Sequence, residues 1–314
     1  MSDIRAVVVN PEAPGRLVLQ RVSPPTPSSS EALVRVEAIS LNRGEVRGAS
    51  QSPAGSRPGW DLAGIVEQPA ADGSGPGART RVVGFVPGGA WAEWVAVPTR
   101  NLAPLPDNVS FAQAATLPIA GLTALYALER GGPLLGRNIL ITAATGGVGL
   151  FACEIAGRAG AHVVALVRRP EQATRVREAG AHDVVVGTDG TAAGAYAPYH
   201  VIIESVGGRV LGNVMGMLTF GGLCVTLGAT EAAEVSFNVR QFFRAGGSLY
   251  GFLIFNEFQH EPAGSGLVRL ARLVADGHLH PPIEVEASWT EIARVAQQLL
   301  DRQFAGKAVL HIDS

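Results

Sequence analysis

The stretch AATGGVG at residues 143–149 constrains the fold more than any other part of the sequence. It follows the apolar run Ile139–Ile141 and precedes a helical stretch of small residues. A glycine-rich turn from a strand into a helix lets backbone N–H groups approach a pyrophosphate at the positive end of the helix dipole. The setting therefore predicts a dinucleotide-binding βαβ unit. The pyrophosphate-binding residues that it predicts are Thr145, Gly146, Gly147 and Val148.

This turn matches the dinucleotide fingerprint only in part. Gly146 and Gly149 have the spacing of its second and third glycines, which allow close backbone approach and helix–strand packing. Ala143 stands where the first glycine is usual. The identification therefore depends on the strand before the turn and the helix after it.

The sequence pattern changes near Arg137. Before this point, short strand-like runs are separated by turns rich in Pro, Gly and Ser, and residues 48–59 have the composition of a loop. After it, apolar runs alternate with helical segments, which indicates a parallel sheet with right-handed crossovers. We therefore expect an α/β protein with a β-rich domain and a doubly wound parallel-sheet domain. The expected segments are a first domain at 1–118, a nucleotide-binding domain at 119–262 and a tail at 263–314 that rejoins the first domain.

The end of the second strand of the βαβ unit indicates which cofactor binds. An NAD-binding protein places Asp or Glu there, against the ribose hydroxyls. Here the run Val163–Val167 is followed by Arg168 and Arg169. Because a guanidinium binds phosphate oxygens in a bidentate fork, these arginines favour NADPH over NADH. The alternative is that they are solvated residues at the end of a strand.

Composition and charge exclude several other classes of protein. The net charge of −2 gives no reason to expect nucleic acid or an anionic membrane as a partner. No apolar run approaches the length needed to cross a bilayer, and we see no signal peptide, so we expect a cytoplasmic protein. Cys153 and Cys224 lie in apolar stretches and are expected to be buried, reduced thiols. Lys307 is the one lysine, and neither a P-loop nor the Tyr-x-x-x-Lys motif of short-chain reductases can be built around it.

Five ordered segments extend the pattern over nearly the whole chain. They are SLNRGE at 40–45, PGWDLAGIV at 58–66, ATLP at 115–118 with GLTA at 121–124, ESVGG at 204–208, and GKAVL at 306–310. With these segments the chain resembles the medium-chain dehydrogenase/reductases, in their zinc-free, zeta-crystallin-like quinone oxidoreductase branch.

The resemblance implies a GroES-like catalytic domain, a Rossmann domain and a cleft between them. It also implies a homodimer, with residues 248–254 as the candidate edge strand, and NADPH-dependent reduction of a quinone or an α,β-unsaturated carbonyl. Asn42 is the implied catalytic residue, near the nicotinamide and able to donate its amide to the substrate; the alternative is a turn residue bonded to local backbone. The residues implied to position the nicotinamide are Thr123, Gly228, Ala229, Phe252 and Leu253.

A zinc alcohol dehydrogenase is the less favoured alternative. No cysteine precedes Cys153 and no histidine precedes His162, although tetrahedral zinc needs such ligands together. Asn42 and Asp61 stand in the regions where the resemblance places zinc ligands. We therefore expect no metal. A non-catalytic, NADPH-binding structural or sensing protein is the second alternative.

Overall fold

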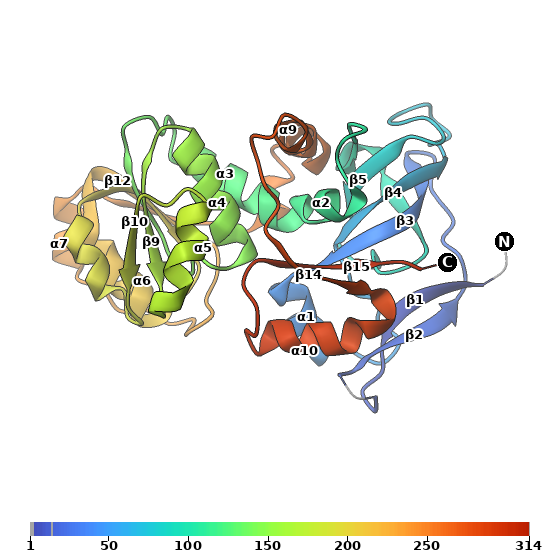
Figure 1. The fold of residues 1–314 in the computed structure, drawn as a ribbon, viewed down its shortest axis with the longest axis horizontal. Coiled ribbons are helices and arrows are strands. Elements are labelled where there is room, and N and C mark those ends of the chain that lie inside the picture. Colours follow the sequence, from blue (N-terminus) through green and yellow to red (C-terminus); the bar gives the residue numbers. More distant parts are fainter. Residues whose placement is uncertain (1–2, 14, 314) are drawn as a thin grey trace. The chain divides into compact units, whose positions relative to one another are not determined.

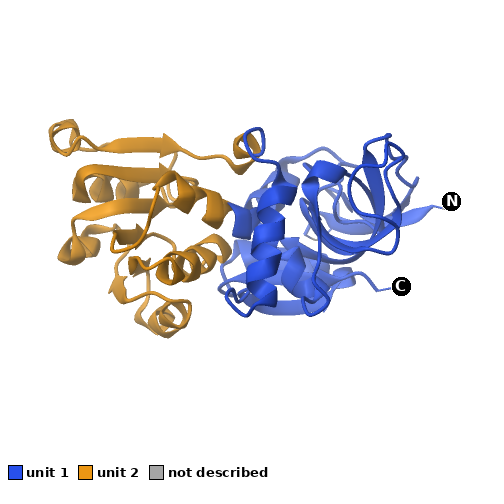
Figure 2. Cartoon of the chain, turned by 90° about the horizontal axis from the view of Figure 1, so that it is seen from above, with its two compact units in different colours: residues 1–122, 258–314 blue, residues 123–257 orange. Residues whose placement is uncertain are grey.

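A computed structural model describes residues 3–13 and 15–313. The chain forms two compact units (Figure 2). The first combines residues up to Leu122 with residues from Phe258 onward, and the second comprises Thr123–Glu257. The segments expected from the sequence, 1–118, 119–262 and 263–314, have other bounds than these two units. Each unit is described by itself below.

The first unit is built on antiparallel strands, as expected of a GroES-like domain (Figure 1). Its seven-stranded sheet has the order β14-β15-β3-β4-β5-β7, with β6 paired to β3, and β1 and β2 form a separate pair. All of these pairs are antiparallel except β14 with β15. The strands are β1 (Ile4–Val9), β2 (Leu17–Val22), β3 (Glu31–Leu41), β4 (Asp61–Gln68), β5 (Arg81–Phe85), β6 (Trp94–Pro98), β7 (Leu102–Pro104), β14 (Ile283–Ser288) and β15 (Lys307–His311).

The described part of this unit also holds four α-helices, a short π-helix and two short 3-10 helices. They are α1 (Arg43–Gln51), α2 (Phe111–Ala115), α9 (Ala263–Ala275), α10 (Ile292–Leu300), the π-helix η2 (Leu117–Gly121), and the 3-10 helices η1 (Thr99–Asn101) and η6 (Trp289–Glu291). The apolar faces of the strands close over a core that contains the fully buried rings of Trp91 and Trp289. Strand β15, near the end of the chain, pairs with β3 in the same sheet.

The second unit holds a six-stranded sheet in which every pair is parallel. Its order is β10-β9-β8-β11-β12-β13, so β8 is central and the strand order reverses between β8 and β11. This is the doubly wound arrangement of a Rossmann domain. The strands are β8 (Asn138–Ile141), β9 (His162–Val167), β10 (Asp183–Val186), β11 (Tyr199–Glu204), β12 (Leu218–Thr226) and β13 (Ser248–Gly251).

Four α-helices of this unit lie between successive strands: α4 (Gly147–Arg158), α5 (Ala173–Glu178), α6 (Gly208–Val214) and α7 (Val239–Arg244). Helix α3 (Leu122–Arg130) precedes β8, and helix α8 (Ile254–Glu257) follows β13. Helix α4 packs on β8 and β9, and α5 packs on β10. Strands buried on both faces read as continuous apolar runs, which is why the sequence predicted them.

The predicted fold class is therefore confirmed, with two local errors. The edge strand expected at residues 248–254 ends at Gly251, and Ile254 begins α8. Residues 48–59 were expected to form a loop, but residues 48–51 belong to α1. Gly44 and Gly48 lower the helix propensity of this segment, and capping overrides it: Asn42 and Glu45 bond each other's backbone and side-chain groups in a capping box. In the part of the chain that the structure describes, no helix has the length and apolar character needed to cross a membrane.

Candidate functional site

The parallel sheet brings most of the predicted cofactor residues to one edge. Because all six strands run in the same direction, the loops after their carboxyl ends lie along the same side of the sheet. The predicted residues in these loops are Thr145 and Gly146 after β8, Arg168 and Arg169 after β9, Gly228 and Ala229 after β12, and Phe252 and Leu253 after β13. Gly147 and Val148 are the first two residues of α4, directly after the β8 loop. Thr123 lies instead in α3, where it is buried.

Gly149 and Gly146 of the glycine-rich turn differ in whether the protein has room for a side chain there. A Cβ atom at Gly149 would lie 2.7 Å from backbone atoms of Ala143 and Ala144, so glycine is needed there for helix–strand packing. A Cβ at Gly146 would meet only the Ala143 carbonyl oxygen, at 3.4 Å, and Gly146 has an ordinary φ of −74°. Packing therefore explains Gly149 but not Gly146.

This difference is the fit test for a bound pyrophosphate. Gly146 is the N-cap of α4, so the first N–H groups of the helix have no acceptor within the helix. An anion at this terminus would receive those N–H groups and the positive end of the dipole. A backbone without a Cβ at Gly146 leaves room for that approach, so the residues present fit a dinucleotide.

Ala143 adopts the conformation that its sequence position suggests. Its φ is +47°, in the left-handed region where glycine is usual. The chain therefore keeps the backbone geometry of the fingerprint's first glycine while carrying an alanine there.

The two arginines after β9 have exposed side chains on a turn that Gln172 organises. The Gln172 Oε1 atom accepts the backbone N–H groups of Arg168 and Arg169, at 3.1 and 3.2 Å. The Arg169 Nε atom lies 3.0 Å from Glu171 Oε1, and the two side chains are 61% and 65% exposed. An ion pair this exposed contributes little, so it does not prevent Arg169 from binding a phosphate.

The remaining predicted positions divide into backbone and side-chain sites. A Cβ at Gly228 would lie 2.9 Å from the Ser205 carbonyl oxygen, so the loop after β12 packs against the loop after β11. Phe252 is buried, whereas Leu253 is 51% exposed.

In the first unit, Asn42 belongs to a buried polar group that we call the Lys307 cluster. Its members are Ser40, Asn42, Glu45, Asp61 and Lys307. The Lys307 ammonium donates to the Leu41 carbonyl at 2.9 Å and to Asn42 Oδ1 at 2.6 Å, and it lies 3.5 Å from Asp61 Oδ2. The cluster thereby joins the end of β3, the start of α1, the start of β4 and the first residue of β15.

Both carboxylates of the cluster accept several hydrogen bonds from neighbouring protein groups. Asp61 accepts from the Ser40 hydroxyl at 2.7 Å and from the Ile119 N–H at 3.1 Å. Glu45 accepts from the backbone N–H groups of Asn42, at 2.6 Å, and Trp60, at 2.8 Å. These donors stabilise the carboxylates in the absence of water.

The Lys307 cluster holds two carboxylates against one ammonium. Burial, and then the neighbouring Asp61, raise the pKa of Glu45 well above its usual value. Burial also raises the pKa of Asp61 and lowers that of Lys307. Both carboxylates therefore take up a proton at a higher pH than they would in water.

Asn42 is oriented by the cluster. Its Oδ1 accepts from Lys307, and its Nδ2 donates to Glu45 Oε1 at 3.0 Å and to Asp61 Oδ2 at 2.7 Å. Both amide hydrogens are thus directed at carboxylates. Donation to a substrate oxygen stays a prediction, and it would require one of these two bonds to be given up.

The contacts within the Lys307 cluster also indicate whether Asn42 and Asp61 could bind zinc. The oxygen atoms that a cation would use at Asn42 and Asp61 already receive the Lys307 ammonium. Among residues 3–13 and 15–313, no group of three or more His, Cys, Asp or Glu side chains has an arrangement that could hold a metal ion. The donor set therefore does not fit zinc.

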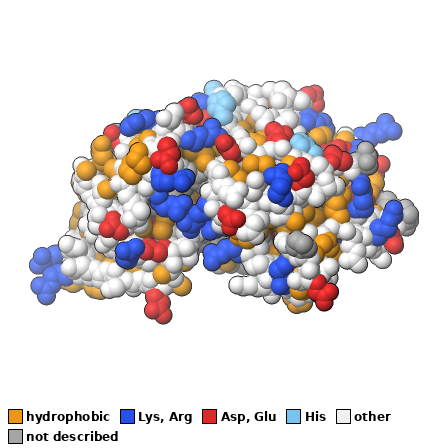
Figure 3. All heavy atoms as spheres, turned by 60° about the horizontal axis from the view of Figure 1, so that its bottom comes forward, with side chains coloured by type: hydrophobic (Ala, Val, Ile, Leu, Met, Phe, Trp, Pro, Cys, Tyr) orange, Lys and Arg blue, Asp and Glu red, His pale blue; other side chains and the backbone are white. Residues whose placement is uncertain are grey.

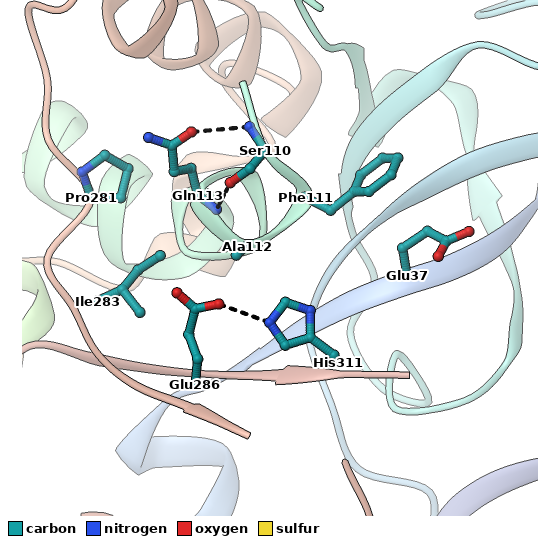
Figure 4. Close-up of a pocket in the computed structure, with 9 residues that line it drawn as sticks. All are labelled: Glu37, Ser110, Phe111, Ala112, Gln113, Pro281, Ile283, Glu286 and His311. Atoms are coloured by element: carbon teal, nitrogen blue, oxygen red, sulfur yellow. Dashed lines mark hydrogen bonds and ion pairs between the residues drawn. The ribbon is translucent and has the colours of Figure 1, made fainter. Parts of the chain in front are cut away.

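A cavity of about 660 Å³ lies elsewhere in the first unit, between α2, β14 and β15 (Figure 4). Its polar lining groups bond one another or their neighbours. His311 Nε2 lies 2.8 Å from Glu286 Oε2, Gln113 and Ser110 cap the start of α2, and Glu37 pairs with Arg35. These bonds direct the lining groups at protein partners rather than at a ligand.

Charged side chains of both signs lie at the surface. On the face shown in Figure 3, basic and acidic side chains are interspersed with apolar ones.

The sequence reasoning missed Ser40, Glu45 and Lys307 as members of one cluster. Two signals were present: the capping-box spacing Asn42-x-x-Glu45, and a sole lysine inside an apolar closing strand. Neither indicates by itself which distant carboxylate the lysine meets.

Comparisons with known proteins agree with this architecture. Two family models match, "Alcohol dehydrogenase GroES-like domain" over residues 28–107 and "Zinc-binding dehydrogenase" over residues 147–268. A quinone oxidoreductase from Rattus norvegicus is 31% identical over 253 residues, which cover 76% of this chain and 75% of the rat protein. The acrylyl-CoA reductase AcuI from Ruegeria pomeroyi is 28% identical over 273 residues, covering 82% of this chain and 81% of that protein.

A solved structure of mycobacterial Rv1454c in complex with NADPH has a TM-score of 0.86 to this chain at 24% identity. The alignment covers 98% of this chain and 100% of the mycobacterial one, so the fold is shared from end to end. The doubly wound sheet, the GroES-like domain, the two family models and the rat relative all indicate the same family. The chain belongs to the medium-chain dehydrogenase/reductase superfamily, in its quinone oxidoreductase branch.

Proposed function

We propose that the protein is an NADPH-dependent oxidoreductase that transfers a hydride to a quinone or an α,β-unsaturated carbonyl without zinc. The observation that carries the proposal is the glycine-rich turn, where the protein's own packing leaves Gly146 unexplained and a bound pyrophosphate explains it. The quinone oxidoreductase from rat and the acrylyl-CoA reductase support the two substrate classes. The bound nicotinamide supplies the hydride.

The choice of NADPH depends on Arg168 and Arg169. Their guanidinium groups follow β9, where a ribose-binding carboxylate would stand in an NAD-binding domain. The NADPH in the mycobacterial structure adds support. Replacing both with alanine removes charge-assisted bonds to the 2′-phosphate, and we expect KM for NADPH to rise about 10- to 100-fold with little change for NADH.

Glu171 provides the matched control for that experiment. Glu171→Gln removes the exposed partner of Arg169 without removing an arginine. NADPH affinity in this variant should stay within about threefold of wild type or increase, as expected for an exposed pair. Equal losses for NADPH and NADH in the double arginine variant would refute the phosphate assignment.

The other predicted residues are proposed to orient the nicotinamide. The backbone at Gly228–Ala229 and Phe252–Leu253 follows two strands of the same sheet edge, and Thr123 is proposed to contribute its hydroxyl. Holding the ring and excluding water are the main tasks of the protein in a hydride transfer.

Asn42 is proposed to act near the substrate, held in a single orientation by the Lys307 cluster. Asn42→Ala should lower kcat while leaving the Kd for NADPH nearly unchanged, because the cofactor residues lie in the other unit. An unchanged kcat would remove Asn42 from the reaction.

Zinc independence is proposed on the chemistry of the same cluster, since the Lys307 ammonium occupies the available oxygens. Metal analysis of the purified protein, followed by activity after treatment with a chelator, tests it. Stoichiometric zinc together with loss of activity on chelation would overturn it.

We also propose a homodimer in the cytoplasm. β13 is an edge strand of the parallel sheet, and Leu249 within it is 40% exposed. Such an edge offers unpaired backbone groups to a second copy. Cys153 and Cys224 are free and buried, as in proteins of a reducing compartment. Sedimentation of the purified chain measures the oligomeric state, and a monomer at micromolar concentration would refute the dimer.

A further inference from the structure

The buried carboxylate of Glu204 lies at the point where the strand order of the parallel sheet reverses. Glu204 is the last residue of β11, has no exposed surface, and stands beside β8 on one side and β12 on the other. In a doubly wound sheet the ligand crevice lies outside the carboxyl ends of the two strands at this reversal, here β8 and β11.

Glu204 holds the loop that follows β11. Its Oε1 atom accepts the Val206 N–H at 2.7 Å, and its two oxygens lie 3.2 and 3.1 Å from the Gly207 nitrogen. Gly207 has φ of 75° and ψ of −160°, a conformation open almost only to glycine. The carboxylate thus accepts the N–H groups of a turn that has no regular secondary structure to satisfy them.

Glu204 also reaches the loop that contains the glycine-rich turn. The Thr142 hydroxyl, directly before Ala143, lies 3.2 Å from Glu204 Oε1 and accepts the Ser205 N–H at 3.0 Å. Thr142 is buried as well. The buried side chains of Glu204 and Thr142 therefore connect the loops after β8 and β11, the two strands between which the strand order reverses.

We propose that Glu204 is a positioning residue for the cofactor: it fixes the loops after β8 and β11 in the shape that binds NADPH, without contacting NADPH itself. The inference rests on the proposed function. Its consequence is a change in cofactor affinity when the acceptor atoms of Glu204 are removed, even if the protein remains folded.

The test compares Glu204→Met with Glu204→Gln in the full chain. Methionine keeps the volume but accepts none of the loop N–H groups, so NADPH should bind about tenfold more weakly or worse. Glutamine keeps one carbonyl oxygen for Val206 and Gly207, and we expect binding within about threefold of wild type. The readouts are the Kd for NADPH by fluorescence titration and the midpoint of thermal unfolding.

Glu257→Met is the matched control. Glu257 is a second buried carboxylate of the same unit, and its partners are Arg130 and Tyr250. We expect it to lower thermal stability with no change in the Kd for NADPH. If Glu204→Met does not fold, Thr142→Val replaces it, and an increase of about fivefold in Kd is expected from the loss of one bridging hydroxyl.

The outcomes separate the inference from the proposed function. Weakened binding in Glu204→Met, recovered by glutamine and absent in the control, supports the inference, as does weakened binding in Thr142→Val. Wild-type affinity in Glu204→Met or in Thr142→Val, or an equal loss in Glu257→Met, overturns the inference alone. A wild-type chain that binds neither NADPH nor NADH overturns the proposed function and the inference with it.

Discussion

Replacing Lys307 with methionine tests whether its ammonium stabilises the buried carboxylates of the Lys307 cluster. Methionine fills a similar volume, so the change removes the ammonium without opening a large cavity. Lys307 is 3% exposed and donates to the Leu41 carbonyl and to Asn42 at 2.9 and 2.6 Å. Losing one partner of a buried ion pair leaves an uncompensated charge, so we expect the free energy of unfolding to fall by about 3–5 kcal/mol.

Urea unfolding of wild type and variant measures this loss. Arg294→Met is the control, because it removes an ion pair to Glu291 whose side chains are 52% and 46% exposed; it should cost less than about 1 kcal/mol. Adding Asp61→Asn to Lys307→Met should restore part of the stability, since it removes one buried charge. A loss below about 1 kcal/mol for Lys307→Met would refute the argument that the ammonium compensates the carboxylates.

The pH dependence of the loss has a defined sign. Burial raises the pKa of Asp61 and Glu45, so the folded protein binds protons at these groups more tightly than the unfolded chain does. Their contribution therefore favours folding most at low pH and is lost as the pH rises through their folded-state pKa values. Lys307 lowers both pKa values, and its removal raises them further. The difference in the free energy of unfolding between Lys307→Met and wild type should be largest near neutral pH, and it should become smaller as the pH falls.

The glycine-rich turn gives three further predictions. Ala143→Gly relieves a left-handed alanine and, after allowing for the greater freedom of glycine in the unfolded chain, should stabilise the protein by about 0.5–1 kcal/mol in thermal unfolding; destabilisation would contradict the left-handed geometry. Gly149→Ala forces a Cβ to within 2.7 Å of the backbone and should destabilise by about 1–3 kcal/mol. Gly146→Ala has room in the protein, so it should melt within a few degrees of wild type yet weaken NADPH binding about tenfold, or about 1.4 kcal/mol. Equal effects of the two glycine substitutions on stability would contradict the separation of packing from ligand approach.

The parallel sheet was predictable because its signals are local. Strands buried on both faces read as apolar runs, and Gly160 and Gly180, which follow α4 and α5 with φ of 81° and 96°, mark where those helices stop. The strands of the first unit were harder to predict from the sequence. Strands β6 and β7 are short and lie in a stretch that reads as irregular, and β6 pairs with β3, which is distant in sequence.

The Lys307 cluster shows what sequence reasoning could not reach. The sequence identified Asn42, Asp61 and Lys307 separately, but the contact between Lys307 and Asn42 spans 265 positions and follows from the pairing of β15 with β3. The same holds for Glu204. It lies in the ESVGG segment, but its hydrogen bond with Thr142 depends on the neighbouring positions of β8 and β11. Both contacts depend on the pairing of strands that are distant in sequence.

Consumption of NADPH by the purified chain, measured with a panel of quinones and α,β-unsaturated carbonyls and repeated with NADH, decides whether the protein is an NADPH-dependent reductase. We expect oxidation of NADPH by at least one acceptor, with a markedly lower kcat/KM for NADH and no dependence on added zinc. Tight binding of NADPH without oxidation by any acceptor would contradict it and favour a protein that binds the cofactor without turning it over.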